Sequence, residues 1–181
     1  MAKQMDSISS SIKAFIAAQK MFFVATADTD GRVNLSPKGL DSFKVLDKNR
    51  VIWLNLTGSG NETAAHLQGV NRMTIMFCSF EKQPLILRLY GTAQCYHKAD
   101  DEFEKLSHHF PTFSGSRQIF DVNVEMVQTS CGFAVPFYEF VSERDTLTKW
   151  SNAKSGEEMS DYWKEKNMET IDGKPTGMKV S

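Results

Sequence analysis

Short apolar stretches, separated by turn residues, recur along most of the first 142 residues. Stretches of this kind are typical of β-strands. We expect strands at 21–26, 32–35, 43–46, 51–56, 72–77, 85–95, 119–127 and 135–141. Tight turns at 28–31 and 47–50 join two pairs of these strands as hairpins, and 36–39 interrupts the second strand. The pattern predicts an antiparallel sheet.

Helical spacing appears mainly near the two ends of the chain. Ile8, Ile12, Phe15 and Ile16 fall on one face of a helix expected over 6–20. Short helices are expected near residue 62 and over 100–109, and the sequence is polar and helical from Glu143 onward. An alternating α/β sheet would need more crossover helices, so a small antiparallel barrel is favoured. We expect a barrel domain over 1–142 and a helical tail over 143–181, packed on the barrel or on a partner subunit.

The loop after the strand at 51–56 is a candidate phosphate site. It holds Gly58 and Gly60, and Ser59 and Glu62 have the Ser-x-x-Glu spacing of a helix capping box. Free N–H groups at a helix N-terminus suit a phosphate. The loop lacks the Gly-Lys-Ser/Thr of a P-loop and the third glycine of a dinucleotide motif. A capped connector without a ligand remains the alternative.

Composition excludes several other functions. The 181 residues include 21 Lys plus Arg and 22 Asp plus Glu, so the balanced charge argues against nucleic-acid and membrane partners. The three cysteines form no C-x-x-C pair, and the four histidines lack the spacing of a zinc site. No apolar run approaches the roughly 20 residues of a membrane span, and no signal pattern opens the chain. We therefore expect a cytoplasmic protein with reduced thiols and no metal.

Residues 22–132 resemble the pyridoxamine 5′-phosphate oxidase-like, FMN-binding split β-barrel proteins. The matching segments are D-G-R-V-N-L-S-P-K-G, V-I-W-L-N-L-T-G-S-G-N-E-T-A-A-H-L, N-R-M-T-I-M-F and L-R-L-Y-G-T-A, in that order. The resemblance implies a mainly β (α+β) fold, an antiparallel six-stranded split β-barrel with peripheral helices. It also implies a homodimer with FMN in a cleft between the subunits.

The sequence departs from the true oxidases at their phosphate and substrate motifs. Those enzymes place a basic residue on the second strand and an Arg-Lys pair at the start of the helix. Ser36 and the pair Glu62-Thr63 stand in these places here. The Arg-x-His substrate motif is also missing after Gly132. We therefore do not expect oxidation of pyridoxamine phosphate, and Lys38 and Arg117 become the candidate cations for an FMN phosphate.

The predicted function is an FMN-binding flavoprotein, an oxidoreductase that passes electrons or hydride between a reduced nucleotide and a small molecule. The alternative is a non-catalytic module that binds or stores FMN, a deazaflavin or haem. No catalytic residue is predicted, and Cys131 is either near the flavin ring or a small buried apolar side chain. The predicted cofactor contacts are Ser36, Pro37, Lys38, Gly39, Leu56, Thr57, Asn61, Thr63, Arg117, Ser130 and Cys131.

Overall fold

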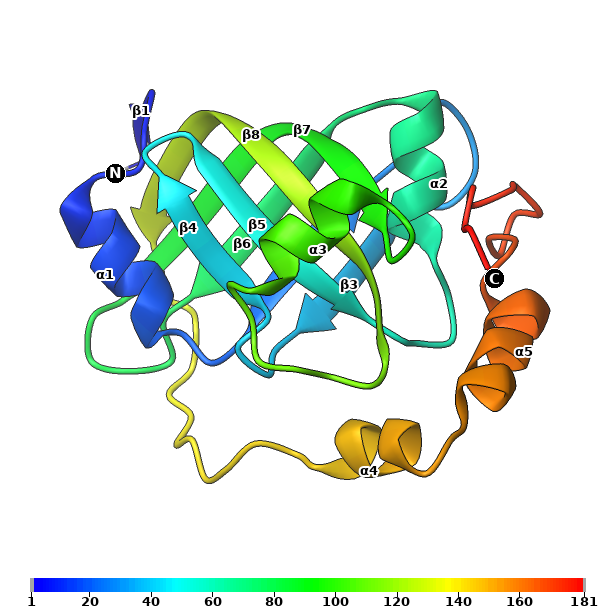
Figure 1. The fold of residues 1–181 in the computed structure, drawn as a ribbon. Helices are drawn as coiled ribbons and strands as arrows, with labels where there is room; N and C mark the ends of the chain where they lie inside the picture. Colours follow the sequence, from blue (N-terminus) through cyan, green and yellow to red (C-terminus); the bar gives the residue numbers. More distant parts are fainter. Residues whose placement is uncertain (1, 181) are drawn as a thin grey trace.

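Eight strands form one antiparallel sheet in the computed structural model, which describes residues 2–180 (Figure 1). The strands are β1 (Lys3–Met5), β2 (Phe22–Thr26), β3 (Asn34–Lys38), β4 (Phe43–Asp47), β5 (Arg50–Leu56), β6 (Met73–Cys78), β7 (Leu85–His97) and β8 (Ser116–Cys131). Their order is β3-β2-β6-β7-β8-β5-β4, and β1 pairs with β8 beside this path. The predicted antiparallel sheet is confirmed. It has two strands more than the six expected among the described residues, and its end strands β3 and β4 do not pair with each other.

One helix lies across a face of this sheet, and the others lie around its edges and ends (Figure 1). They are α1 (Ser10–Ala18), α2 (Glu62–Gly69), α3 (Asp101–Ser107), α4 (Thr146–Asn152) and α5 (Gly156–Lys166). Helix α1 is shorter than expected because Ser9 caps its start, where the hydroxyl accepts a hydrogen bond from the Ile12 amide. Ile8, Ile12 and Ile16 are buried, so the predicted apolar face of α1 does pack on the sheet. No helix within residues 2–180 is long and apolar enough to cross a membrane.

Strands β7 and β8 are the longest and organise the sheet. Along its other edge, β8 pairs first with β5 and then, near its end, with β1. The ladder between β7 and β8 shifts register at Tyr90/Gly91. A Cβ atom on Gly91 would lie 1.9 Å from the carbonyl oxygen of Asn123, so only glycine permits this close approach of the two backbones.

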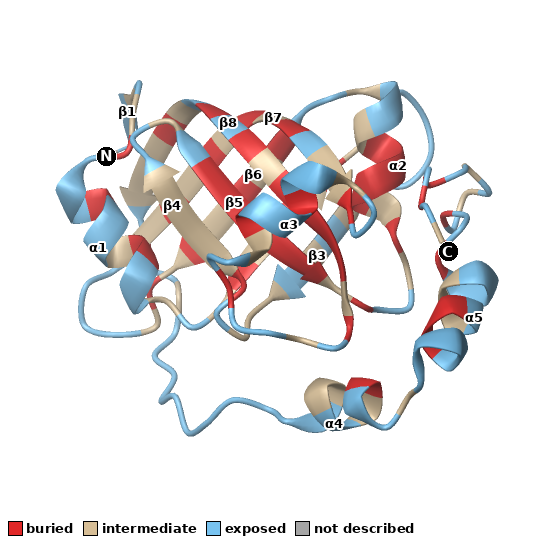
Figure 2. Ribbon diagram, in the orientation of Figure 1, coloured by how far each residue is buried: buried red, intermediate tan, exposed pale blue. Residues whose placement is uncertain are grey.

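The core has two clusters: one contains Trp53 and Phe120, and the other packs Ile52 and Leu54, from the opposite face of β5, against α3. Buried and half-buried positions alternate along β2 and β6, as expected for strands with one face in the core. Trp53 stacks on Phe120 with the ring centroids 4.4 Å apart, and Phe22 packs edge-on to Trp53. In Figure 2 the buried residues gather in the centre of the sheet and on the inner side of α2.

The strand predicted at 135–141 is absent. Residues 132–145 instead run as an irregular segment from β8 to α4, and nearly all of them are exposed (Figure 2). Tyr138 donates one backbone hydrogen bond to the carbonyl of Phe80, and Pro136 has no N–H to donate. The short apolar stretch at 135–141 therefore does not form a strand. We call residues 132–145 the connecting segment.

Two local predictions around the candidate site are corrected. The capping box at Ser59 and Glu62 is wrong: α2 begins at Glu62, its N-cap is Asn61, and no side chain caps it. The carboxylate of Glu62 instead accepts a hydrogen bond from the amide of Ile171 at 3.2 Å. Residues 36–38 do not interrupt a strand but belong to β3. Pro37 is tolerated there because β3 is an edge strand.

We expect Gly91→Ala to lower the free energy of unfolding by about 1–3 kcal/mol, because the added methyl group must displace the backbone of β8. Urea denaturation of the two proteins measures this difference. Gly156→Ala is the matched control, since nothing lies within 4 Å of a Cβ atom at Gly156. An equal loss in both variants would contradict the packing argument.

Candidate functional site

Lys38 is the last residue of β3 and turns its side chain into the fold. Its ammonium nitrogen lies over the ring of Trp53, 5.5 Å from the centroid. Burial, followed by the positive charge of Arg117, lowers the pKa of Lys38 to about 8. No carboxylate within residues 2–180 offsets this effect. Lys38 is therefore a desolvated cation without an acidic partner.

Arg117, near the start of β8, is a second buried cation. Its side chain is almost fully enclosed, with 4% of the residue exposed. One guanidinium nitrogen donates to the side-chain oxygen of Asn167 at 2.6 Å and another to the carbonyl of Gly60 at 2.7 Å. Burial lowers the pKa of Arg117 to about 10. Both acceptors are neutral, although buried charges are normally paired with an opposite charge.

The turn from Thr57 to Thr63 lies next to Arg117 but is covered by the end of the same chain. The Thr57 hydroxyl donates to the Gly115 carbonyl at 2.7 Å and accepts from the indole N–H of Trp163 at 2.9 Å. Asn167 donates to the carbonyl of Gly58 at 3.0 Å. The structure thus brings Thr57, Asn61, Thr63 and Arg117 together and buries all four.

Residues 167–180, which we call the C-terminal cap, are held by ion pairs as well as by these hydrogen bonds. Lys174 pairs with Asp28 at 2.7 Å, Asp172 pairs with Arg32, and Lys179 pairs with Asp100 at 2.6 Å. A hydrogen bond from Lys174 keeps the pKa of Asp28 below its usual value. Figure 1 shows the cap beside α2, far in sequence but near in space.

A large apolar cavity opens where Lys38 ends β3. It encloses about 1040 Å³ and reaches from the end of α1 to the connecting segment and α4. Its walls come from residues 18–23, 37–40, 78–81 and 138–150. Pro37, Lys38 and Gly39 of the predicted site line it. Lys38 therefore lines this cavity and is also close enough to Arg117 for the two charges to interact.

Ser130 and Cys131 do not join the other predicted contacts within one chain. They end β8, whereas Arg117 lies at its start, roughly 45 Å away along the strand. Ser130 accepts a hydrogen bond from Arg88 at 3.2 Å. Cys131 is a free, exposed thiol, so its interpretation as a small buried side chain is wrong.

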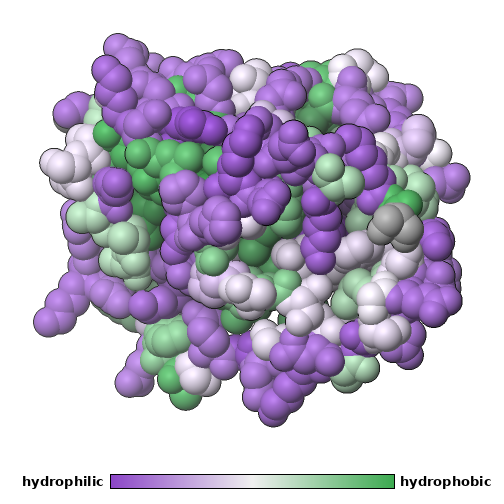
Figure 3. Space-filling view, in the orientation of Figure 1, coloured by the Kyte–Doolittle hydropathy of each residue, from purple (hydrophilic) through white to green (hydrophobic). Residues whose placement is uncertain are grey.

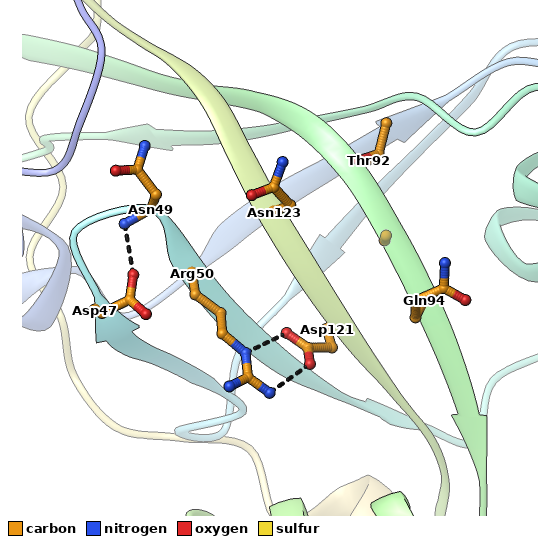
Figure 4. A pocket seen from close by; sticks show the side chains of 8 residues that line it. Asp47, Asn49, Arg50, Thr92, Gln94, Asp121 and Asn123 are labelled. Carbon is orange, nitrogen blue, oxygen red and sulfur yellow. Dashed lines mark hydrogen bonds and ion pairs between the residues drawn. The ribbon is translucent and has the colours of Figure 1, made fainter.

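A second hollow, of about 400 Å³, lies on the outer face of β5, β8 and β7 (Figure 4). Two charged side chains at its centre pair with each other, because Arg50 donates two hydrogen bonds to Asp121 at 2.9 and 2.6 Å. The other side chains drawn there are mostly amides and hydroxyls. The remaining carboxylate, Asp47, accepts a hydrogen bond from the Asn49 amide at 2.7 Å, so this hollow offers no unpaired cation to a ligand.

Sequence reasoning missed the far wall of the apolar cavity. Tyr138, Phe140, Leu147 and Trp150 line it. Two of them were assigned to a strand and two to the helical tail. Aromatic residues recurring in an otherwise polar segment were the available signal, but nothing in their spacing shows that they face β3.

Together, the open antiparallel sheet and the helices at its ends define a split β-barrel. The sequence profile of the pyridoxamine 5′-phosphate oxidase family matches residues 8–131. The chain belongs to this family.

A curated relative agrees with this assignment. The chain is 36% identical over 146 residues to the pyridoxamine 5′-phosphate oxidase family protein ustO of Aspergillus flavus. That match covers 78% of this chain and 59% of ustO, so the chain spans about three fifths of that relative's length.

Solved structures confirm the predicted fold class. HupZ of Group A Streptococcus superposes with a TM-score of 0.52 at 22% identity, over 66% of this chain and 91% of HupZ. A putative pyridoxamine 5′-phosphate oxidase from Lactobacillus delbrueckii gives a TM-score of 0.54 at 19% identity, over 68% of this chain and 94% of that one. At these identities the likeness shows the fold alone.

Lys38→Met should stabilise the ligand-free protein at neutral pH by about 2–3 kcal/mol, because it removes a desolvated charge. The unfolded lysine holds its proton up to about pH 10.5, whereas the folded one releases it near pH 8. The native protein should therefore gain stability between these two pH values, and the variant should lack this gain. Urea denaturation of the parent protein and the Lys38→Met variant at pH 7, 9 and 10.5 tests this prediction. A Lys38→Met variant less stable than the parent at pH 7 would contradict the prediction.

Proposed function

We propose that this protein is an FMN-binding flavoprotein that works as an oxidoreductase, with Lys38 and Arg117 as the cations that meet the FMN phosphate. One observation carries the proposal: Lys38, a desolvated cation with no ion-pair partner within residues 2–180, lines a large apolar cavity, and the buried Arg117 is close enough for its charge to act on Lys38. A phosphate would supply the missing negative charge. Membership of the pyridoxamine 5′-phosphate oxidase family supports the choice of a flavin phosphate.

The residues present fit such a cofactor at both of its ends. Lys38 and Arg117 suit the phosphate, and the cavity that Lys38 lines suits a flat ring system. When bound, FMN supplies hydride or electron transfer, while the protein supplies binding and orientation. Ser36, Pro37, Gly39 and Leu56 remain proposed contacts along the strands between these ends.

The C-terminal cap determines how the turn at 57–63 contributes. Thr57, Asn61 and Thr63 stay proposed contacts, but the hydroxyl hydrogen of Thr57 is already donated to Gly115. The amide of Asn34 donates to the Thr63 oxygen at 3.1 Å, which leaves the Thr63 hydroxyl hydrogen uncommitted, but Thr63 is buried. Contact of these side chains with a phosphate therefore requires a rearrangement of the turn and the cap. Lys38 requires none.

We also propose a homodimer. Val33 and Leu35, on and beside the edge strand β3, are 73% and 62% exposed. An unpaired edge strand with exposed apolar side chains is a surface that proteins normally cover. Ser130 and Cys131 of a second copy would then be available to the cofactor. In Figure 3 apolar surface also gathers in patches between hydrophilic side chains on the face shown. Nucleic acid and membrane are not proposed as partners, and a cytoplasmic location is proposed.

Storage without turnover is the second candidate function, since the cavity contains no residue assigned to catalysis. Haem is the less favoured ligand, because no histidine lines the cavity among the described residues. Oxidation of pyridoxamine phosphate is not proposed. Anaerobic addition of NADH or NADPH to the FMN-loaded protein separates the two functions: bleaching of the flavin absorption supports the oxidoreductase, and an unchanged spectrum supports storage.

Lys38→Met and Arg117→Met should each weaken FMN binding by about ten- to a hundredfold, and riboflavin binding much less. The reason is that only FMN carries the phosphate that these cations meet. Isothermal titration with both ligands measures the ratio. Lys20→Met is the matched control, because Lys20 lines the same cavity but is not assigned to the phosphate. Equal losses for FMN and riboflavin would refute the phosphate assignment.

Sedimentation velocity at micromolar concentration should show a dimer, and Leu35→Glu should shift it toward monomer. A carboxylate on the edge strand would be buried against the second copy without a partner. Lys3→Glu, on an exposed part of β1, serves as the charge control. A monomeric parent protein would rule out a cofactor cleft shared between chains.

A further inference from the structure

We infer that the part of the apolar cavity enclosed by the connecting segment and α4 binds the molecule on which the flavin acts, a flat apolar compound without net charge. This inference deepens the proposed function and rests on it for the chemistry. The binding site itself follows from the walls, charges and size of the cavity.

The two walls of the cavity are apolar and rich in aromatic rings. The barrel contributes Met21, Phe23 and Phe80, and the opposite wall contributes Phe140 and Trp150. Flat apolar ligands gain most from such walls, because rings stack or meet edge to face.

The far wall is attached to the barrel at a defined point. The ring of Tyr138 packs against that of Phe80 with the centroids 5.3 Å apart, and the Tyr138 amide donates to the Phe80 carbonyl at 3.1 Å. Lys20 lies over the ring of Phe140, 5.4 Å from its centroid. The connecting segment is thus held across the cavity, although most of its residues are exposed to solvent.

The charges around the cavity give no preference for an ion. The basic side chains are Lys20, Lys38 and Arg144, and the acidic ones are Glu81, Glu139 and Glu143. The three positive and three negative charges balance. An anion or a cation would lose hydration without a matching net field, whereas a neutral molecule would not. The favoured ligand is therefore apolar and uncharged.

The size of the cavity leaves room for more than one ring system. Pockets that enclose a drug-sized ligand have volumes of roughly 300–1,000 Å³. The cavity, at about 1040 Å³, lies at the upper end of this range. A flavin ring against the barrel wall and a second flat molecule against Phe140 and Trp150 would fit together within it.

Titration with N-phenylnaphthylamine, an uncharged probe whose fluorescence rises in apolar sites, tests the inference on the flavin-free and the FMN-loaded protein. We expect saturable binding to both. Phe140→Ala and Trp150→Ala should weaken it by about fivefold or more, because each removes an apolar wall. Phe133→Ala is the matched control: Phe133 belongs to the connecting segment and is 82% exposed, but does not line the cavity. Circular dichroism checks that each variant folds.

Competition by naphthol, naphthoate and naphthyltrimethylammonium tests the charge argument, and naphthol should compete best. The inference is overturned if the probe does not bind, if Phe133→Ala weakens it as much as Phe140→Ala, or if a charged competitor is strongest. Complete displacement of the probe by FMN would also overturn it, because the flavin would then fill the cavity. If FMN fails to bind but the probe binds with the expected mutational pattern, the proposed function fails and the apolar site stands.

Discussion

The buried guanidinium of Arg117 is the interaction on which the arrangement of the site depends. It joins three parts of the chain: β8, which carries it, the turn whose Gly60 carbonyl accepts one N–H, and the C-terminal cap, whose Asn167 accepts another. Asn167 in turn donates a hydrogen bond to the Gly58 carbonyl. A guanidinium satisfies neutral acceptors through hydrogen bonds, but these acceptors do not neutralise its charge. The folded chain therefore keeps a positive potential next to the turn.

Lys38 is a second charge whose desolvation lowers the stability of the folded protein. Its ammonium group is desolvated and close enough to Arg117 for the two charges to disfavour each other, which is why its pKa falls to about 8. A protein selected only for stability would place an apolar side chain there. Functional sites commonly retain such unfavourable arrangements, because the ligand supplies the compensating interaction. The cation over the Trp53 ring recovers only part of the lost hydration.

Much of the sheet could be predicted because the strand signal is local. The alternating burial along β2 and β6 can be predicted from the two-residue period of a strand. The apolar face formed by Ile8, Ile12 and Ile16 can be predicted from the period of a helix. The details of the site could not be predicted in this way. Ser59 and Glu62 have the same spacing as Ser155 and Glu158, yet only the second pair forms a capping box. Glu62 instead bonds to Ile171, more than one hundred residues away, and no local pattern contains that contact.

The hydrogen-bond capacity of each group limits which side chains can meet a phosphate. A phosphate oxygen accepts hydrogen bonds, so its partner must have an uncommitted N–H or O–H. Thr57 has one hydroxyl hydrogen, and the Gly115 carbonyl already accepts it. Lys38 has three N–H donors, and no acceptor is assigned to them within residues 2–180. Arg117 has five, of which two go to Asn167 and Gly60. A third, the Nε–H, lies 3.2 Å from the side-chain oxygen of Asn55. With the cap in place, Lys38 can meet an anion directly, whereas Arg117 and the Thr63 hydroxyl keep uncommitted hydrogens but are buried. The tertiary contacts of the C-terminal cap, which no local sequence motif contains, decide which neighbours of the turn can bind.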